Sequence, residues 1–183
     1  MSRLDEVISY LKKARAARDD LKNAFNIDGE QVLCDGYSCI SLNESGKFTL
    51  KETPGSLAPK NKGLSLTENI RQALNQEGGE LYISIKRLEA FIKAKRAERK
   101  AAHEKDLYKR PLEIDAEFLG IYHKPIYNIS DVVSVDSVRL LRIMRIIATG
   151  KQLVKITYGK RKCDPVGISG AFGSALLLPV IRR

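Results

Sequence analysis

Apolar residues recur at helical spacing in three stretches of the chain, and these are separated by segments in which apolar and polar residues alternate. Ser2 and Asp5 form a variant of the capping box that starts a helix. The first helix is therefore predicted at the N-terminus, with Lys12, Lys13, Arg15 and Arg18 on its polar face. Its expected core face consists of Leu4, Val7, Ile8 and Leu11.

Two further helices are predicted from the same periodicity. One begins at Ser84, and beyond Lys95 its apolar stripe fades while basic residues continue towards Pro111, which ends the segment. That stripe is Ile85, Leu88, Phe91 and Ile92. The other helix is predicted over Ser137 to Thr149, behind the N-cap Asp136, and Gly150 is expected to close it as a left-handed C-cap. Its expected core face includes Val138, Leu141 and Met144.

Short runs with strand character lie between the helices and are bounded by turn-forming residues. The runs are Gln31 to Cys34, Tyr37 to Leu42, Glu80 to Ile83, Leu153 to Tyr158, Pro165 to Ser169 and Ser174 to Ile181, with a short helix over Thr67 to Gln76 and further short strands within 112–135. Residues 43–64 contain several Gly and Pro and predict a loop or linker. This order favours an α+β fold in which helices pack on one face of an antiparallel sheet.

Composition narrows the class of protein. The chain has 183 residues, of which 43% are hydrophobic and 30% charged, which is typical of a globular domain. No apolar run reaches the about 18 residues that a membrane span requires. The N-terminus carries Asp5 and Glu6 where a secretory signal needs a basic start and an apolar core. We therefore expect a soluble, cytoplasmic protein without a membrane partner.

Residues for metal binding and for catalysis are sparse. The three cysteines, Cys34, Cys39 and Cys163, are odd in number and have no Cys-x-x-Cys spacing, and His103 and His123 are each followed by a charged residue typical of surfaces. We expect no disulfide or zinc scaffold, no metal centre and no cofactor. The sequence has no Gly-rich phosphate loop, no nucleophile with a spaced base and no carboxylate cluster, so we do not expect an enzyme.

The positive charge of the chain is concentrated in two segments. The net charge is +10, and residues 84–110 carry 10 bases against 4 acids while residues 136–183 carry 10 against 2. Arg139, Arg142 and Arg145 recur every third residue, which places them along one helix ridge, and we expect all three to be exposed. Such a field attracts polyanions, because neutralised phosphates release counterions. The alternative is that these basic helices are simply solvated faces.

Two segments of the chain, Ala16 to Phe25 followed by Gln31 to Tyr37, and Val135 to Pro179, carry a resemblance to a known family. The first resembles the segment of bacterial sliding clamps that ends in a Thr-Asp-Gly-His-Arg motif, and the second is similar to the last helix and three strands of the clamp. The clamp closes on Met-Pro-Met-Arg, here Leu178-Pro179-Val180-Ile181-Arg182. The resemblance covers about the first 45 and last 50 residues. Because a cellular clamp subunit is far longer, the chain resembles a reduced member of the type that phages or mobile elements encode.

The resemblance implies a processivity ring of the replicative DNA polymerase, in which basic helices line the DNA hole and an antiparallel sheet lies outside. Residues 1–60 and 111–183 would then be clamp-like halves, joined by a linker, strand and basic helix in 61–110. Binding would be to phosphates without base reading, because sliding needs mobile, sequence-independent contacts. The expected DNA-binding residues are Lys12, Lys13, Arg15, Arg139, Arg142 and Arg145, followed by Lys93, Arg96 and Arg99. A homo-oligomeric ring is a further expectation.

The resemblance also implies a pocket for a peptide motif of a polymerase or another replication protein. The matching residues are Cys34, Gly36 and Tyr37 in the turn, and Leu177, Leu178, Pro179 and Val180 in the terminal segment. Ser38 replaces the family's arginine and Leu178 its methionine. If the resemblance holds, the two segments should lie side by side as a shallow apolar groove. The alternative is that the terminal segment fills the core from an edge strand.

A second function class remains open on the same residues. A clamp-fold module that has lost DNA binding could use its sheet or pocket to assemble a protein complex, and salt-dependent DNA binding separates the two hypotheses. Asp35 could be interpreted as a catalytic acid, but an Asp before Gly36 is far more typical of a turn.

Overall fold

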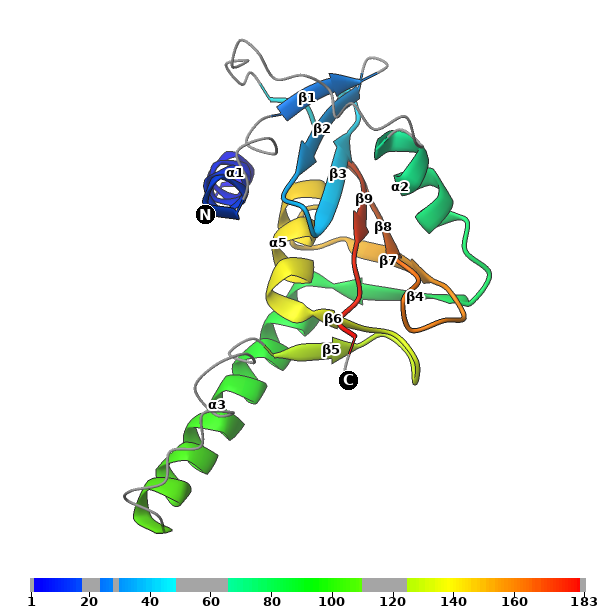
Figure 1. Cartoon of the computed structure of the whole chain (residues 1–183). Coiled ribbons are helices and arrows are strands. Elements are labelled where there is room, and N and C mark those ends of the chain that lie inside the picture. Colours follow the sequence, from blue (N-terminus) through cyan, green and yellow to red (C-terminus); the bar gives the residue numbers. More distant parts are fainter. Residues whose placement is uncertain (1, 18–23, 28–29, 49–65, 110–124, 182–183) are drawn as a thin grey trace.

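The computed structural model describes residues 2–17, 24–27, 30–48, 66–109 and 125–181 (Figure 1). The helices are α1 (Arg3–Ala17), α2 (Leu66–Leu74), α3 (Ile85–Lys109) and α5 (Ser137–Ile147). The strands are β1 (Ala24–Ile27), β2 (Glu30–Cys34), β3 (Ser38–Leu42), β4 (Gly79–Ser84), β5 (Ile126–Asn128), β6 (Ser134–Asp136), β7 (Leu153–Tyr158), β8 (Val166–Gly170) and β9 (Gly173–Leu177). The mixed α+β class expected from the sequence is therefore confirmed.

Seven strands form one sheet in the order β1-β2-β3-β9-β8-β7-β4, and every pairing in it is antiparallel. The sheet joins the first three strands of the chain to the last three, because β3 pairs with β9 along its whole length, from Ser38 opposite Leu177 to Leu42 opposite Gly173. The hairpin β5–β6 forms a separate two-stranded sheet beside the C-terminal segment (Figure 1).

The order of elements repeats within the fold. A helix followed by a three-stranded antiparallel meander occurs first as α1-β1-β2-β3 and again as α5-β7-β8-β9. Because the last strands of the two units pair antiparallel, a local two-fold axis lies between β3 and β9. The two helices, α1 and α5, pack against each other. The resemblance predicts a clamp-like half at each end of the chain, but not the pairing of the two units through β3 and β9.

The main core lies between α1, α3 and α5 and one face of the sheet. Its fully buried members include Val7 of α1, Leu88 of α3, Met144 of α5, and Leu33 and Ile40 of the sheet. Residues Ile85 and Ile92 of the stripe predicted for α3 are also buried, while Phe91 is half-buried and packs edge-on against Tyr127.

Helix α2 packs on the opposite face of the sheet (Figure 1). There Ile70 forms a smaller cluster with Cys34 and Cys39, and Leu66, Leu74 and Leu176 pack against it. The expectation that the helices share one face is therefore wrong. The physical reason is that β2, β3 and β9 carry apolar side chains at successive positions, so that both faces of this part of the sheet need covering.

Helix α1 begins as predicted, but its core face is rotated from the predicted one. Ser2 N donates to Asp5 Oδ2 and Asp5 N donates to the Ser2 hydroxyl, which completes the capping box. Val7 and Tyr10 face the core, whereas Leu4 and Ile8 are exposed. Tyr10 is suited to the core because its hydroxyl reaches Ser38.

An arginine near the start of α1 links this helix to α5 by a hydrogen bond. Arg3 Nε donates to the carbonyl of Ile146 at 2.9 Å, and its other guanidinium nitrogen donates to the carbonyl of Gly46 at 2.6 Å. The guanidinium also lies over the rings of Phe48 and Phe172. Arg3 therefore supports the α1–α5 pair by hydrogen bonds and cation–π contacts together.

Helix α5 has the predicted start and a different end. Asp136 accepts hydrogen bonds from the backbone of Val138 and Arg139, so the predicted N-cap is confirmed. The helix ends at Ile147, and the extended residue Ala148 follows it, so Gly150 does not cap the helix. Its buried residues are Ser137, Leu140, Ile143, Met144, Ile146 and Ile147, while Leu141 is half-buried.

Helix α3 begins inside the core and then leaves the body of the protein as an arm (Figure 1). Its side chains are exposed from Lys93 to Ala101, and the helix ends at Lys109, before Pro111, as the sequence predicts. Among the described residues, no helix is both long enough and apolar enough to cross a membrane.

Candidate functional site

The turn between β2 and β3 is built around Asp35. One carboxylate oxygen accepts from the backbone N–H of Tyr37 at 2.9 Å, from the N–H of Ser38 at 2.8 Å and from the Ser38 hydroxyl at 3.0 Å. Gly36 has a φ of 83°, in the left-handed region that glycine favours. The interpretation of Asp35 as a turn former is confirmed, and the turn leaves Tyr37 52% exposed.

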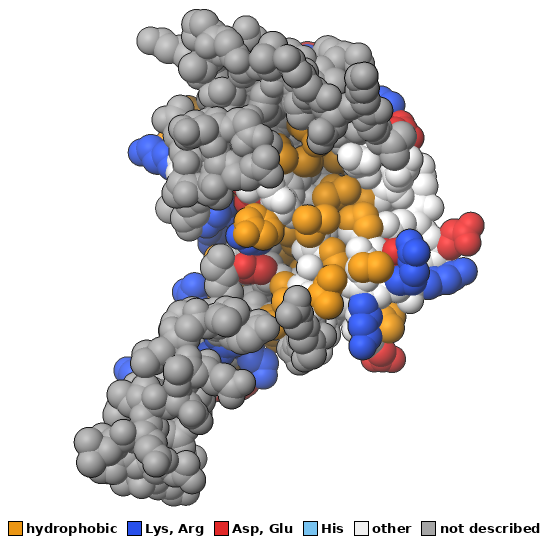
Figure 2. Space-filling view, in the orientation of Figure 1, with side chains coloured by type: hydrophobic (Ala, Val, Ile, Leu, Met, Phe, Trp, Pro, Cys, Tyr) orange, Lys and Arg blue, Asp and Glu red, His pale blue; other side chains and the backbone are white. Residues whose placement is uncertain are grey.

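The C-terminal segment lies directly beside this turn. Leu178 N donates to Tyr37 O at 2.9 Å, extending the β3–β9 pairing by one more bond, and Val180 N donates to Ser134 O at 2.8 Å. The predicted proximity of Gly36 and Tyr37 to the Leu178-Pro179 segment is therefore confirmed. Leu178 is 44% exposed and Ile181 is also exposed. Figure 2 shows hydrophobic side chains gathered over this part of the molecule.

A groove of about 970 Å³ opens next to Leu178 on the face of the sheet that α2 covers. Its apolar lining includes Cys39, Leu176, Leu178 and Pro165. One wall is α2 and the residues after it, with Asn69, Gln72, Asn75, Gln76 and Glu77, and the other is the β7–β8 turn, with Lys160, Arg161 and Asp164. The shape and lining suit an extended chain with apolar side chains and a polar backbone.

The residues predicted for the peptide pocket do not all face this groove. Leu178 lines it, whereas Leu177 is fully buried in the main core and Cys34 is buried under α2. Val180 lines a second hollow, next to the β5–β6 hairpin. For Leu177 the alternative, core packing, is the one that the structure bears out. Successive residues of a strand point to opposite faces, so Leu176 and Leu178 share the groove side.

Most of the groove wall is not predicted by the sequence. The amides of α2 and the charged β7–β8 turn meet only because α2 crosses β8 and β9. The amphipathic pattern of α2, with the amides Asn69 and Gln72 on its polar side, is the available signal. It could not indicate which face of the sheet the helix covers.

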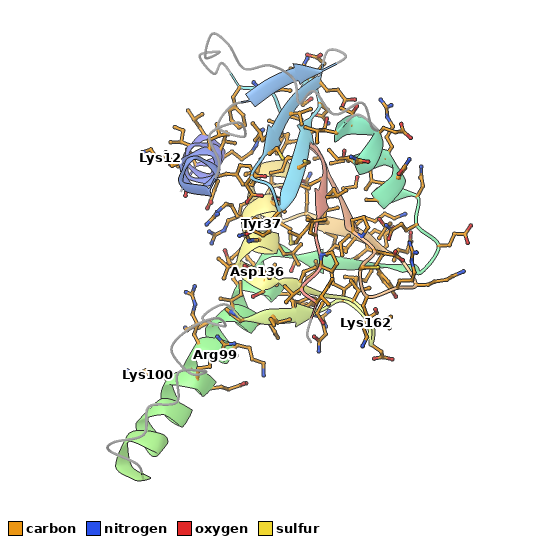
Figure 3. The ribbon with its side chains drawn as sticks, viewed as in Figure 1. Lys12, Tyr37, Arg99, Lys100, Asp136 and Lys162 are labelled. Atoms are coloured by element: carbon orange, nitrogen blue, oxygen red, sulfur yellow. The ribbon has the colours of Figure 1, made fainter. Side chains whose placement is uncertain are left out.

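The arginine at the start of the predicted ridge is neutralised by acids. Arg139 forms ion pairs with Asp35 at 3.0 Å and with Asp136 at 3.3 Å, and its guanidinium lies 4.0 Å from the centroid of the Tyr37 ring. Figure 3 shows Tyr37 and Asp136 close together at this junction. The expectation that Arg139 is exposed is wrong, because its side chain spans from α5 to the β2–β3 turn.

The arginine at the other end of the ridge is also paired. Arg145 contacts Glu6 of α1 at 2.9 Å and Glu89 of α3 at 2.7 Å, and these bonds, that to Glu89 foremost, raise the pKa of Arg145. Arg145 thus joins three helices and is half-buried rather than exposed as expected. Arg142, also half-buried, has no ion pair with another described residue.

The remaining predicted DNA-binding residues lie on α1 and α3. Lys12, Lys93 and Arg96 are exposed, and Arg99 is exposed as well, with an interaction partner. Figure 3 shows Lys12 on α1 and Arg99 with Lys100 on the α3 arm. Lys13 and Arg15 belong to α1, but their side chains lie outside the described part of the structure.

Two of the three cysteines form a close pair. Cys34 and Cys39 are opposite each other in the β2–β3 register, and their sulfur atoms are 3.1 Å apart. None of the three cysteines forms a disulfide bond, and Cys163 is exposed. Within the described ranges, no three His, Cys, Asp or Glu side chains gather in a way that could hold a metal ion.

Comparison with protein-family models, with curated proteins and with solved structures finds no significant match to this chain.

Proposed function

We propose that the protein is a sliding-clamp-like DNA-binding protein that tethers a replication or repair partner. The observation that carries the proposal is the packing of α1 and α5 side by side on one face of a continuous antiparallel sheet, with the Asp35 turn and the C-terminal segment meeting at its middle. This arrangement supports the resemblance in both of its motifs. The net charge of +10 supports a polyanionic partner.

The DNA contacts are assigned to Lys and Arg side chains that form no ion pair with a carboxylate of the described residues. Arg139 and Arg145 are held by carboxylates, so the phosphate contacts are assigned to Lys12 and Arg142, with Lys93 and Arg96 on α3. Flexible cations on helices bind phosphates without reading bases. Each neutralised phosphate contributes about 0.9 to the salt slope on duplex DNA, so four contacts give a slope of about 3.6. One subunit therefore binds weakly near physiological salt.

The partner is assigned to the groove beside Leu178. Exposed Leu178, with Leu176 and Cys39, offers an apolar floor, and the α2 amides offer hydrogen bonds to a peptide backbone. A synthetic peptide with the clamp-binding motif of a bacterial replicative polymerase is the probe. Leu178→Ala should weaken its binding at least about tenfold, because anchoring apolar residues dominate such sites, while Val132→Ala, an exposed residue outside this groove, should leave it unchanged.

A second candidate is an interaction module without DNA binding. It is favoured by the neutralisation of Arg139 and Arg145, which removes two cations from the ridge that the sequence predicted. In this case the α1–α5 face only supports the fold, and the groove alone binds a protein partner.

A salt titration of two fluorescent duplexes of unrelated sequence separates the candidates. The wild type should bind both equally, and the double variant Lys12→Glu/Arg142→Glu should lower the salt slope by about 2. Lys162→Glu on the β7–β8 turn (Figure 3) changes the same type of charge away from α1 and α5 and is the matched control. If the wild type does not bind DNA at low salt, or if the control lowers the salt slope as much as the double variant does, the interaction module is the function.

Residence on DNA also requires several copies of the chain. A single subunit of this size does not encircle a duplex, and joining weak sites raises their effective concentration. Measuring the mass in solution, with and without DNA, tests this part of the proposal.

A further inference from the structure

Cys34 and Cys39 are placed for a disulfide bond that the sequence does not predict. Asp35 N donates to Ser38 O, so this pair is hydrogen-bonded, and the adjacent pair, Cys34 opposite Cys39, is the non-hydrogen-bonded kind. In such pairs the Cα atoms are about 4.5 Å apart and the side chains are closest. Disulfides bridge Cα separations of about 4.4–6.8 Å. The backbone of the hairpin therefore already has the Cα separation that a disulfide requires.

The sulfur atoms need little movement to react. They are 3.1 Å apart, with the Cys39 thiol donating to the Cys34 sulfur. A disulfide is about 2.05 Å long, so closure takes roughly 1 Å of approach, within the reach of small side-chain rotations. The hairpin itself need not open.

The groove gives a small reagent a route to one of the two thiols. Cys39 lines the groove, whereas Cys34 does not, although both residues are more than nine-tenths buried. Cys39 is therefore the sulfur that a reagent meets first. Cys34 lies behind it, in position to complete the reaction.

We propose that Cys34 and Cys39 form a redox-active dithiol, a modification site that a low-molecular-weight disulfide oxidises through the groove to a cross-strand disulfide. The Cys39 thiolate attacks one sulfur of the reagent, which forms a mixed disulfide and releases one reagent thiolate. The Cys34 thiolate then attacks the Cys39 sulfur and releases the second. The protein loses two electrons and two protons, and the reagent becomes two thiols.

The surroundings of the Cys39 thiol make this reaction slow. The hydrogen bond with Cys34, followed by burial, raises the pKa of the Cys39 thiol. Thiolate is the attacking species, so the rate at neutral pH is low and rises with pH. The proposal does not rest on the proposed function, because the reaction needs only the hairpin and an unoccupied groove, the same groove that the proposed function assigns to a peptide.

The test uses the full chain with Cys163→Ser, which removes the exposed thiol. The protein is equilibrated with mixtures of reduced and oxidised glutathione, free thiols are trapped by alkylation, and peptide masses are measured. The folded protein should form the Cys34–Cys39 disulfide at a glutathione ratio at least about tenfold more reducing than the urea-unfolded chain, because folding holds the thiols together. Single variants separate the two positions: Cys34→Ser should accumulate a glutathione adduct on Cys39 at least about tenfold faster than Cys39→Ser accumulates one on Cys34.

Three results would overturn the proposal. One is that the folded chain stays reduced at ratios that oxidise the unfolded chain. Another is that both single variants, checked for native circular dichroism, acquire adducts at equal rates. The third is a disulfide that forms only between molecules.

Discussion

Asp35 uses its two carboxylate oxygens for different purposes. One closes the β2–β3 turn by accepting from the backbone of Tyr37 and Ser38, and the other binds Arg139 of α5. Its side chain is 8% exposed, so both sets of bonds form largely out of water. The residue thus joins the turn to the second half of the chain, 104 positions away.

Asp35→Ala should therefore destabilise the protein by about 3 kcal/mol, because it removes the acceptor of the turn and leaves the half-buried Arg139 with one carboxylate partner, Asp136. Asp35→Asn, which keeps an acceptor for the turn, should cost less. Asp131→Ala, at an exposed position, is the control and should change stability by no more than about 0.5 kcal/mol. Urea unfolding measures the free energy of unfolding of all three variants. Equal stability of Asp35→Ala and the control would contradict the assignment.

Arg142 and Arg145 share one helix ridge but should respond differently to charge reversal. Arg145→Glu would place a carboxylate beside Glu6, which is only 6% exposed, and beside Glu89. The free energy of unfolding should therefore fall by about 2–4 kcal/mol. Arg142→Glu, at a site without an ion pair in the described part of the chain, should change stability by no more than about 0.5 kcal/mol. Thermal and urea unfolding of the two single variants provide the comparison. If both unfold alike, the three-helix ion pair does not stabilise the fold.

At the scale of elements, the docking of α2 depends on a close approach to β8. A Cβ on Gly167 would lie 2.4 Å from the carbonyl oxygen of Ala73 and 2.5 Å from the hydroxyl of Thr157. That hydroxyl donates to the same carbonyl at 2.9 Å. Glycine at this position therefore lets the helix backbone approach the sheet closely enough for the bond.

Gly167→Ala should push α2 away from the sheet and destabilise the protein by about 1–3 kcal/mol. Gly150→Ala is the matched control, because a Cβ there meets nothing within 4 Å. Besides the unfolding midpoint, alkylation of Cys39 reports on α2, since displacement of the helix should expose this thiol and accelerate its reaction. Unchanged stability and alkylation in Gly167→Ala would show that α2 docks loosely.

At the scale of the whole molecule, the two helix-meander units share one sheet, and β3 and β9 lie at its centre. Ile40 and Ala175, opposite each other across the local axis, are both fully buried. Separating the units would break this pairing and divide the main core. The two halves should therefore unfold together.

Hydrogen exchange tests this cooperativity. The amides of β3 and β9 should exchange only by global unfolding, with the largest protection in the chain. The α3 arm, exposed from Lys93 to Ala101, should exchange orders of magnitude faster because few contacts oppose its local opening. Protection in β7–β8 that survives conditions under which β3 exchanges freely would mean that the units unfold separately.

The sequence by itself determined the elements and several of their ends. The capping box at Ser2, the N-cap at Asp136, the Asp35 turn and the strand Leu153–Tyr158 follow from local rules, since each depends on residues a few positions apart. The proximity of the turn to the C-terminal segment followed from the family resemblance, and the β3–β9 pairing bears it out.

Only the tertiary structure decided which face each helix covers and which charges remain free. Periodicity shows that a helix has an apolar side but not which side of a sheet that side meets, so the prediction that the helices share one face is wrong for α2. An ion pair depends on residues far apart in the chain, so Arg139 and Arg145 looked free until Asp35, Glu6 and Glu89 were brought beside them. The groove and the thiol pair have the same origin, because both need several elements to meet, and no local spacing encodes that meeting.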